Sequence, residues 1–225
     1  MRLSTLNKTV LLFKNKAVAF LNGLTSNEVT KPQNAFLNIH GRIIATFDQL
    51  KISDDEVVIL IEQPFVNKLL QHVNRYAKLS GVTIEQPARN IYFDLDADAP
   101  VDPQDWVFAQ KKGRIIATPR TLPANVTDEE FRLFRVANGI PIQGVDYTDE
   151  LLLNVSMRDH VSFTKGCYLG QEPISKVYNR SQPSWKLVVK REDECSPDEK
   201  GKMTSKVSDP ATGNVKGFVF VSNKE

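Results

Sequence analysis

Hydrophobic and polar residues alternate along several short stretches in the first third of the chain. The clearest stretches are 9–13, 42–53 and 56–62, and turn-forming residues such as Asp54 and Asp55 separate neighbouring stretches. Alternation with a period of two, interrupted by such turns, is typical of antiparallel strands joined by tight connections. This part of the sequence therefore predicts an antiparallel meander.

Two later segments carry complete signals for helices. One helix is predicted to begin after Pro64, where apolar residues repeat every three and four positions, and to end at Gly81. A second helix is predicted to follow the capping box formed by Thr127 and Glu130 and to end at Gly139. In both segments, start and stop residues agree with the apolar spacing, so we expect two amphipathic helices.

Weaker signals predict a short helix and a hairpin. The short helix is expected over 16–22, with Asn15 as its cap and Gly23 as its stop. The segments 106–109 and 114–117 are typical of a hairpin. The whole pattern predicts an α+β protein with antiparallel sheets flanked by helices.

The composition changes near Ser184, after which short basic strands alternate with polar turns. We therefore predict two domains, residues 1–183 and residues 184–225. The second is long enough for three or four strands, and we expect a small β-barrel-like domain.

Overall composition narrows the class of protein. The 225 residues include 29 Lys and Arg against 27 Asp and Glu, a net charge of +2, and 41% are hydrophobic, which is typical of a globular chain. The longest aliphatic run, 57–61, is far shorter than the roughly 20 residues that cross a bilayer, so no membrane span is predicted. Two distant cysteines exclude a disulfide framework and favour a reducing, cytoplasmic location.

Several common catalytic motifs are absent from the sequence. The glycines form no G-x-G and no G-x-x-x-x-G-K pattern, which excludes a dinucleotide fingerprint and a phosphate loop. His40, His72 and His160 are isolated from one another, and no zinc-type spacing joins them to a cysteine. We therefore predict no metal site, and for His72 a structural role among its apolar neighbours.

The most unusual segment is 163–173, where two glycines surround Cys167 and precede a predicted helix near Gln171. Lys165 and the helix start would both lower the pKa of the thiol and make it a better nucleophile or metal ligand. An inert cysteine in a tight turn is an equally supported alternative. The net charge of +5 over 165–191 suits an anionic ligand or partner, although a solvated basic face would give the same pattern.

This segment also carries a resemblance to a known family. Residues 165–172 match every defined position of K-G-C-[FY]-x-G-Q-E, the signature of the YgfZ family of folate-binding relatives of the aminomethyltransferase T-protein. Residues 20–29 resemble the family's amino-terminal helix and turn, 41–45 its hairpin, and 135–141 its R-x-x-x-G-[IF]-P segment. Together these similarities extend over most of 5–185.

The resemblance implies a T-protein-like fold around a central folate pocket. It also implies a role in assembling or maintaining iron-sulfur clusters, and thereby in tRNA modification. Glu172 would accept the N–H donors of the pterin edge, and Cys167 would be the reactive thiol. Phe131 and Tyr168 would stack on the pterin. The implied binding residues for tetrahydrofolate or a related folate are Thr25, Asn27, Arg42, Phe131, Arg135, Lys165, Tyr168, Gln171, Glu172 and Lys176.

One departure from the T-protein bears on catalysis. The T-protein has a catalytic aspartate just after the hairpin glycines, where this sequence has Ala45 or Thr46, with Asp48 further along. We therefore expect a non-enzymatic accessory protein, a monomer whose partners are folate and iron-sulfur client or assembly proteins. The alternatives are a folate-dependent aminomethyl or one-carbon transferase and a tRNA-binding module, although direct nucleic-acid binding is disfavoured.

Overall fold

The computed structural model describes residues 1–155, 159–210 and 212–223. The strands are β1 (Leu3–Thr5), β2 (Lys8–Lys14), β3 (Gln33–Leu37), β4 (Ile43–Lys51), β5 (Glu56–Glu62), β6 (Thr83–Glu85), β7 (Asn90–Asp94), β8 (Trp106–Ala109), β9 (Arg114–Thr118), β10 (Trp185–Arg191), β11 (Thr204–Ser208) and β12 (Val215–Ser222). The helices are α1 (Ala17–Leu24), α2 (Val66–Ser80), α3 (Asp128–Asn138), α4 (Leu152–Val155), α5 (Gln171–Arg180) and α6 (Pro197–Lys202), with short 3₁₀ turns at Gln63–Phe65 and Glu192–Glu194.

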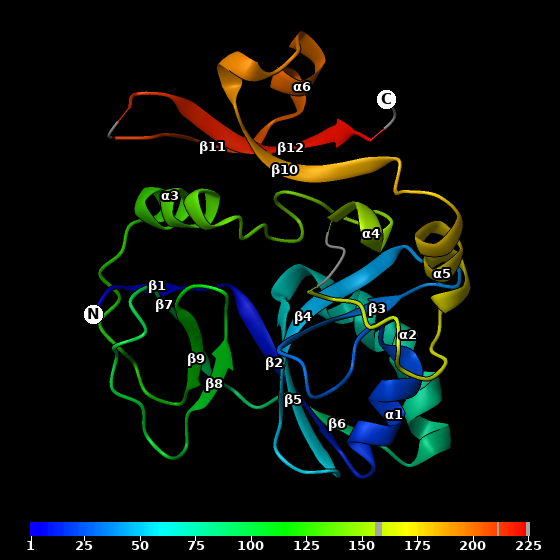
Figure 1. Ribbon diagram of the computed structural model, residues 1–225. Coiled ribbons are helices and arrows are strands. Elements are labelled where there is room, and N and C mark those ends of the chain that lie inside the picture. The colour runs from blue at the N-terminus through cyan, green and yellow to red at the C-terminus, as the bar shows by residue number, and fades with distance from the viewer. Residues whose placement is uncertain (156–158, 211, 224–225) are drawn as a thin grey trace.

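The strands form three sheets in which neighbouring strands run antiparallel. Their orders are β3-β4-β5-β2-β6, β1-β7-β9-β8 and β10-β12-β11. Figure 1 shows the last sheet across the top of the molecule, with α3 and α4 between it and the two larger sheets, and with α1 and α2 beside the five-stranded sheet. The predicted mixture of antiparallel sheets and helices is confirmed.

The predicted meander and hairpin are present. β3, β4 and β5 pair in sequence order, with Phe47 of β4 opposite Ile61 of β5. β8 and β9 form the predicted hairpin. Two predicted helix ends are also confirmed, because Gly81 and Gly139 adopt the left-handed conformation after α2 and α3.

The predicted boundaries of the first helix are wrong. Asn15 does not cap α1; Lys16 occupies the N-cap position with a φ of 58°, and its backbone N–H donates to Asp55 Oδ1 over 2.9 Å. The helix also continues through Gly23 to Leu24. A carboxylate from the β4–β5 turn therefore holds the residue that precedes the helix, and a local reading of the sequence does not reveal this contact.

Burial on both faces explains the continuous aliphatic run of β5. Val57, Ile59 and Ile61 pack in a cluster with residues of α1 and α2. Val58 and Leu60 point to the opposite face, where they pack with residues of β7, β8 and β9. The five-stranded sheet is thus the central layer of the larger part of the molecule.

The carboxy-terminal strands form an open sheet. β12 lies between β10 and β11, so three strands leave two free edges and do not close on themselves. The expected β-barrel-like shape is therefore not confirmed. Val207 and Phe218 of this sheet pack against Val136 of α3, which fixes the sheet over the middle of the molecule.

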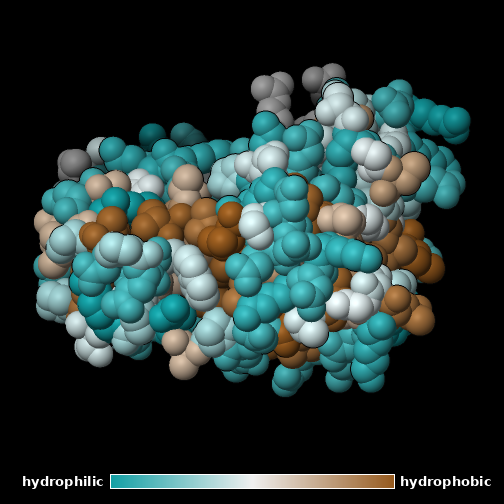
Figure 2. Space-filling model, turned by 90° about the horizontal axis from the view of Figure 1, so that it is seen from below, coloured by the Kyte–Doolittle hydropathy of each residue, from teal (hydrophilic) through white to brown (hydrophobic). Residues whose placement is uncertain are grey.

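The surface is mostly hydrophilic but not uniform. Seen from below, hydrophilic side chains cover most of the face, and a band of hydrophobic residues lies in its left half (Figure 2). Among the described residues, no helix combines the length and the apolar character needed to span a membrane.

Candidate functional site

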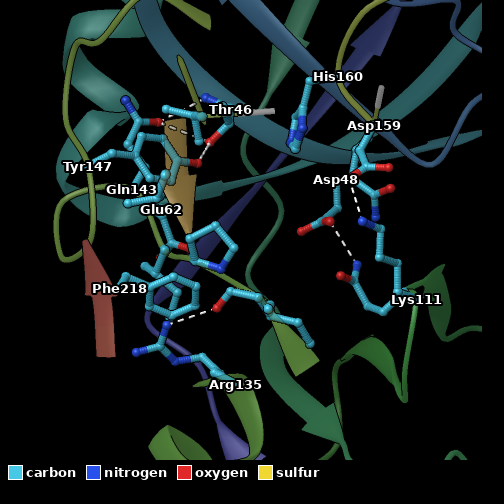
Figure 3. Close-up of a pocket in the computed structure, with 18 of the residues that line it drawn as sticks. Thr46, Asp48, Glu62, Lys111, Arg135, Gln143, Tyr147, Asp159, His160 and Phe218 are labelled. Atoms are coloured by element: carbon cyan, nitrogen blue, oxygen red, sulfur yellow. Dashed lines mark hydrogen bonds and ion pairs between the residues drawn. The ribbon is translucent and has the colours of Figure 1, made fainter. Parts of the chain in front are cut away.

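A cavity of about 620 Å³ lies where the two larger sheets, α3, α4 and the carboxy-terminal sheet meet. We call it the central pocket. One side is apolar and includes Phe93, Phe131 and Phe218, and the rings of Phe93 and Phe131 are 5.2 Å apart. The lining also includes buried polar groups from β2, β4 and β5, such as Asp48 and Thr46 (Figure 3), so the pocket offers both aromatic and polar surface.

A buried amine and two carboxylates form part of this polar surface. Lys8 Nζ lies 3.2 Å from Asp48 Oδ2 and 2.8 Å from Glu62 Oε1. Gln110 Nε2 donates to Asp48 Oδ1 over 2.7 Å. Burial alone would lower the pKa of Lys8, but the charges of Asp48 and Glu62 outweigh this effect and raise it. The ammonium group is therefore held in its charged form beside both carboxylates.

Thr46, Gln143 and Tyr147 form a second polar group, whose members hydrogen-bond one another. Thr46 Oγ1 and the Tyr147 hydroxyl are 2.6 Å apart, and the backbone N–H of Thr46 donates to Gln143 Oε1 over 2.8 Å. Burial raises the pKa of Tyr147, so this hydroxyl remains protonated. Figure 3 shows these side chains together on one side of the pocket.

His160 lies near Asp48 on the opposite side of the view in Figure 3. Its Nδ1 is buried and has no hydrogen-bond partner among the described residues. Burial lowers the pKa of His160 to about 4, although the charges of Asp48 and Asp159 act in the other direction. The ring is therefore neutral near pH 7. From the sequence, His160 could be recognised only as an isolated histidine, because nothing in its spacing connects it to β4.

Two residues expected to bind folate line this pocket, Phe131 and Arg135. The Arg135 guanidinium is occupied by protein groups. Nη1 donates to Ile140 O over 3.0 Å and to Asp146 Oδ2 over 2.9 Å, and Nη2 donates to Ser205 Oγ over 2.9 Å. Arg135 thus joins α3 to the following loop and to β11.

The signature segment lies at a second cavity of about 410 Å³, which Glu28, Lys165 and Cys167 help to line. Lys165 Nζ donates to the carbonyl oxygens of Thr25 and Asn27, each over 2.7 Å. Burial lowers the pKa of Lys165 to about 8. The Cys167 side chain is exposed.

The turn containing Thr25 and Asn27 connects this second cavity with the central pocket. Besides receiving Lys165 through backbone carbonyls, Asn27 donates through Nδ2 to Asp159 O over 3.0 Å. Ser26 Oγ donates to His160 O over 2.6 Å. This turn therefore fixes the backbone of a residue that lines the central pocket, and supports the signature loop from its other side.

The other expected binding residues lie outside the lining of the central pocket. Tyr168 is buried in a cluster between β3, α4 and α5, whereas Gln171, Glu172 and Lys176 belong to α5, where Glu172 and Lys176 are exposed. Arg42 is exposed and lies 3.6 Å from Asp149. Among the described residues, no three His, Cys, Asp or Glu side chains are grouped so that they could hold a metal ion.

No family model matches the chain. An uncharacterized protein of Haemophilus influenzae is 24% identical over 148 residues, which is 62% of this chain and 52% of that protein. The matched region thus spans about half the length of this relative. The crystal structure of glycine cleavage system aminomethyltransferase T from Bartonella henselae superposes with a TM-score of 0.76 at 13% identity, covering 98% of this chain and 78% of the other. The chain is therefore similar in fold to an aminomethyltransferase of the glycine cleavage system.

Proposed function

We propose that the protein binds tetrahydrofolate or a related folate in the central pocket. With this ligand it acts as an accessory factor in iron-sulfur cluster assembly or repair, and thereby in tRNA modification. The folate part is supported by the fold and by the pocket. The iron-sulfur part is supported by the resemblance of 165–172 to the YgfZ signature.

The composition and size of the central pocket carry the folate proposal. Its volume of about 620 Å³ falls in the range of roughly 300–1,000 Å³ typical of small-molecule sites. Phe93 and Phe131 offer aromatic surface to a planar ring, and the buried carboxylate of Asp48 also lines the pocket. A pterin combines a flat ring with a row of N–H donors, so it requires both kinds of wall.

Asp48 is the carboxylate best situated to accept those N–H donors. It is buried and lines the central pocket, whereas Glu172 is exposed on α5. Its two oxygens already receive Gln110 and Lys8. Each carboxylate oxygen has two acceptor sites, so capacity for a ligand remains. We therefore assign to Asp48 the pterin contact that the sequence resemblance implied for Glu172.

Calorimetric titration of the purified protein with tetrahydrofolate tests this assignment. We expect saturable binding, and an affinity about tenfold or more weaker for Asp48→Asn, because a charge-assisted hydrogen bond is lost. The control is Glu172→Gln, which should leave the affinity unchanged. The absence of saturable binding at millimolar tetrahydrofolate would exclude the folate part of the proposal. A loss caused by Glu172→Gln alone would return the pterin contact to α5.

Cys167 is the proposed functional thiol, because it is exposed beside the cavity that Lys165 helps to line. We expect Cys167→Ala to fold normally but to fail to restore the activity of iron-sulfur enzymes in a strain that lacks the protein. Cys195 is the matched control, since it is buried and its thiol donates to Arg191 O over 3.2 Å. Full rescue by Cys167→Ala would show that the function does not require this thiol.

One observation favours a second candidate function, folate-dependent aminomethyl or one-carbon transfer. The sequence lacks an aspartate at the position aligned with the T-protein residue, but Asp48 supplies a buried carboxylate to the central pocket. Incubation with a glycine-derived aminomethyl donor and tetrahydrofolate distinguishes the two functions. Turnover that is lost in Asp48→Asn would favour the transferase, and binding without turnover would favour the accessory factor.

A further inference from the structure

Two residues that line the same cavity each carry a buried polar atom without a partner. Asn154 Oδ1 and His160 Nδ1 are both buried and unpartnered among the described residues, and both residues line the central pocket. Asn154 is only 7% exposed. Buried polar atoms are almost always hydrogen-bonded, since leaving one unpaired costs about 1–3 kcal/mol. Such an atom in a cavity wall therefore points to a missing hydrogen-bond partner.

Most residues with a buried, unpartnered side-chain atom lie away from both cavities. Six buried side-chain atoms in the described residues lack a partner, and the other four belong to His72, Arg89, Asp94 and Asp105. None of those four residues lines the central pocket or the second cavity. Of these two cavities, only the central pocket is lined by residues that carry such atoms, and it is lined by two of them.

The protein holds both residues in fixed positions. Asn154 belongs to α4, whose neighbouring residues Leu152 and Leu153 are buried in a hydrophobic cluster. The backbone of His160 is held by Ser26 Oγ, which donates to His160 O over 2.6 Å. Two unpaired side-chain groups on anchored backbone segments in a cavity wall give a ligand a hydrogen-bonding surface that is largely in place before binding.

The electrostatic surroundings identify the kind of ligand group. The charges that act on His160 are the carboxylates of Asp48 and Asp159 and the amines of Lys8 and Lys111. Lys8 pairs with Asp48, and Lys111 pairs with Asp159 over 2.6 Å. Because the cations here are paired and the imidazole is neutral, this end of the pocket favours an uncharged polar group over a carboxylate or phosphate.

We propose that Asn154 and His160 are binding residues that hydrogen-bond the uncharged planar ring of the ligand, one that carries N–H donors and acceptors side by side. The inference rests on the proposed function and adds to it two recognition residues beyond Asp48. It also gives the ligand an orientation. The heterocyclic head lies at the α4 end of the pocket, and any charged tail lies elsewhere.

The test compares the two halves of tetrahydrofolate as separate probes. We would titrate the full chain with tetrahydrofolate, with 6-methyltetrahydropterin as the head, and with p-aminobenzoylglutamate as the tail. Asn154→Leu and His160→Phe are expected to weaken binding of the head by about tenfold or more and to leave binding of the tail unchanged. His72→Phe is the matched control. It also removes a buried unpartnered imidazole nitrogen, but from a residue outside both cavities.

Thermal unfolding without ligand separates binding from a structural role. If the two side chains serve only the ligand, both variants should melt at the same temperature as the wild type or higher, since each removes an unpaired buried group. A lower melting temperature together with lost binding would mark them as structural and overturn the inference.

The outcomes also distinguish this inference from the folate proposal. Unchanged binding of tetrahydrofolate by both variants would overturn the inference and leave the proposed function intact. Binding of the head alone, dependent on Asn154 and His160, would support the inference and exclude tetrahydrofolate as the ligand. If the wild type binds neither the head nor tetrahydrofolate, both proposals fail.

Discussion

Gly170 holds the beginning of α5 against the connection between β3 and β4. It has a φ of +82°, and a Cβ at this position would lie 2.4 Å from Asn38 O and 3.0 Å from Leu37 Cβ. Gly166, four residues earlier in the same signature, has no heavy atom within 4 Å of such a Cβ and no positive φ. The two signature glycines therefore differ in what they require of the backbone.

We accordingly predict that Gly170→Ala lowers the unfolding free energy by about 2 kcal/mol or more, because it combines backbone strain with a clash against a carbonyl oxygen. Gly166→Ala is the control and should change stability by less than about 0.5 kcal/mol. Urea denaturation of the two variants and the wild type measures both effects. Equal stability of the two variants would contradict the prediction.

His160 should make stability sensitive to mild acid. Its pKa is about 4 in the folded protein, against the ordinary value of 6.5 expected when the chain is unfolded. Between these values the unfolded chain binds more protons. The unfolding free energy is therefore fully retained above about pH 6.5 and decreases as the pH falls towards 4.

The expected loss attributable to His160 is on the order of 2 kcal/mol between pH 7 and pH 4.5. It is measured as the difference in pH dependence between the wild type and His160→Phe in chemical denaturation. The same substitution at His40, which is exposed, is the control and should follow the wild type. Parallel curves for wild type and His160→Phe would show that the ring is solvated in the folded state.

At the scale of elements, α3 depends on its capping box. Thr127 Oγ1 accepts from the backbone N–H of Glu130 over 3.2 Å, and Glu130 Oε2 accepts from the backbone N–H of Thr127 over 2.8 Å. The helix carries Phe131 and Arg135, which line the central pocket. The cap thus fixes the start of the element that supplies the aromatic wall.

Thr127→Ala should lower stability by about 1 kcal/mol and increase amide hydrogen exchange in the first turn of α3. Ser196→Ala, which removes the equivalent cap of α6, should cost a similar free energy. In that variant the exchange of α3 should stay at the wild-type rate. Increased exchange of α3 in both variants would indicate global rather than local destabilisation.

Most elements could be predicted because their signals are local. Alternation predicted the meander, and the ends of α2 and α3 follow from Gly81 and Gly139, whose left-handed conformations stop each helix. The start of α1 could not be predicted, since the backbone N–H of its N-cap residue Lys16 is held by Asp55 from the β4–β5 turn. A local pattern fails wherever a distant residue replaces the local partner.

The same reasoning explains which residues of the candidate site could be predicted from the sequence and which could not. Arg135 was identified within a contiguous motif and Phe131 as a stacking residue implied by the resemblance, and both line the central pocket. Lys8, Asp48 and His160 were not predicted as site residues. Lys8 lies in β2 and Asp48 in β4, and His160 lies in a loop more than a hundred residues after β4, so only the folded chain brings them together. Pairing of strands, not spacing in the sequence, assembles that part of the pocket.

At the scale of the whole molecule, a buried ion pair joins the carboxy-terminal sheet to the rest of the fold. Arg135 and Asp146 are 5% and 4% exposed, and Asp146 Oδ1 accepts from Thr204 Oγ1 over 2.9 Å and from Ser205 Oγ over 2.6 Å. Ser205 has a φ of 50° and lies where the register of β11 shifts. The irregular strand thereby directs two hydroxyl groups to one carboxylate.

Removing one member of this pair should therefore loosen the sheet that covers the central pocket. Asp146→Ala leaves the Arg135 guanidinium buried and unpaired, and we expect a loss of about 3 kcal/mol, with faster amide exchange in β11 and β12. Asp198→Ala breaks an exposed pair with Lys202 and should cost less than about 1 kcal/mol. The double variant Arg135→Met with Asp146→Leu should recover much of the loss, because no unpaired charge remains. If Asp146→Ala costs no more than Asp198→Ala, the apolar contacts of the sheet, such as those of Val207 and Phe218 with Val136, are enough to hold it.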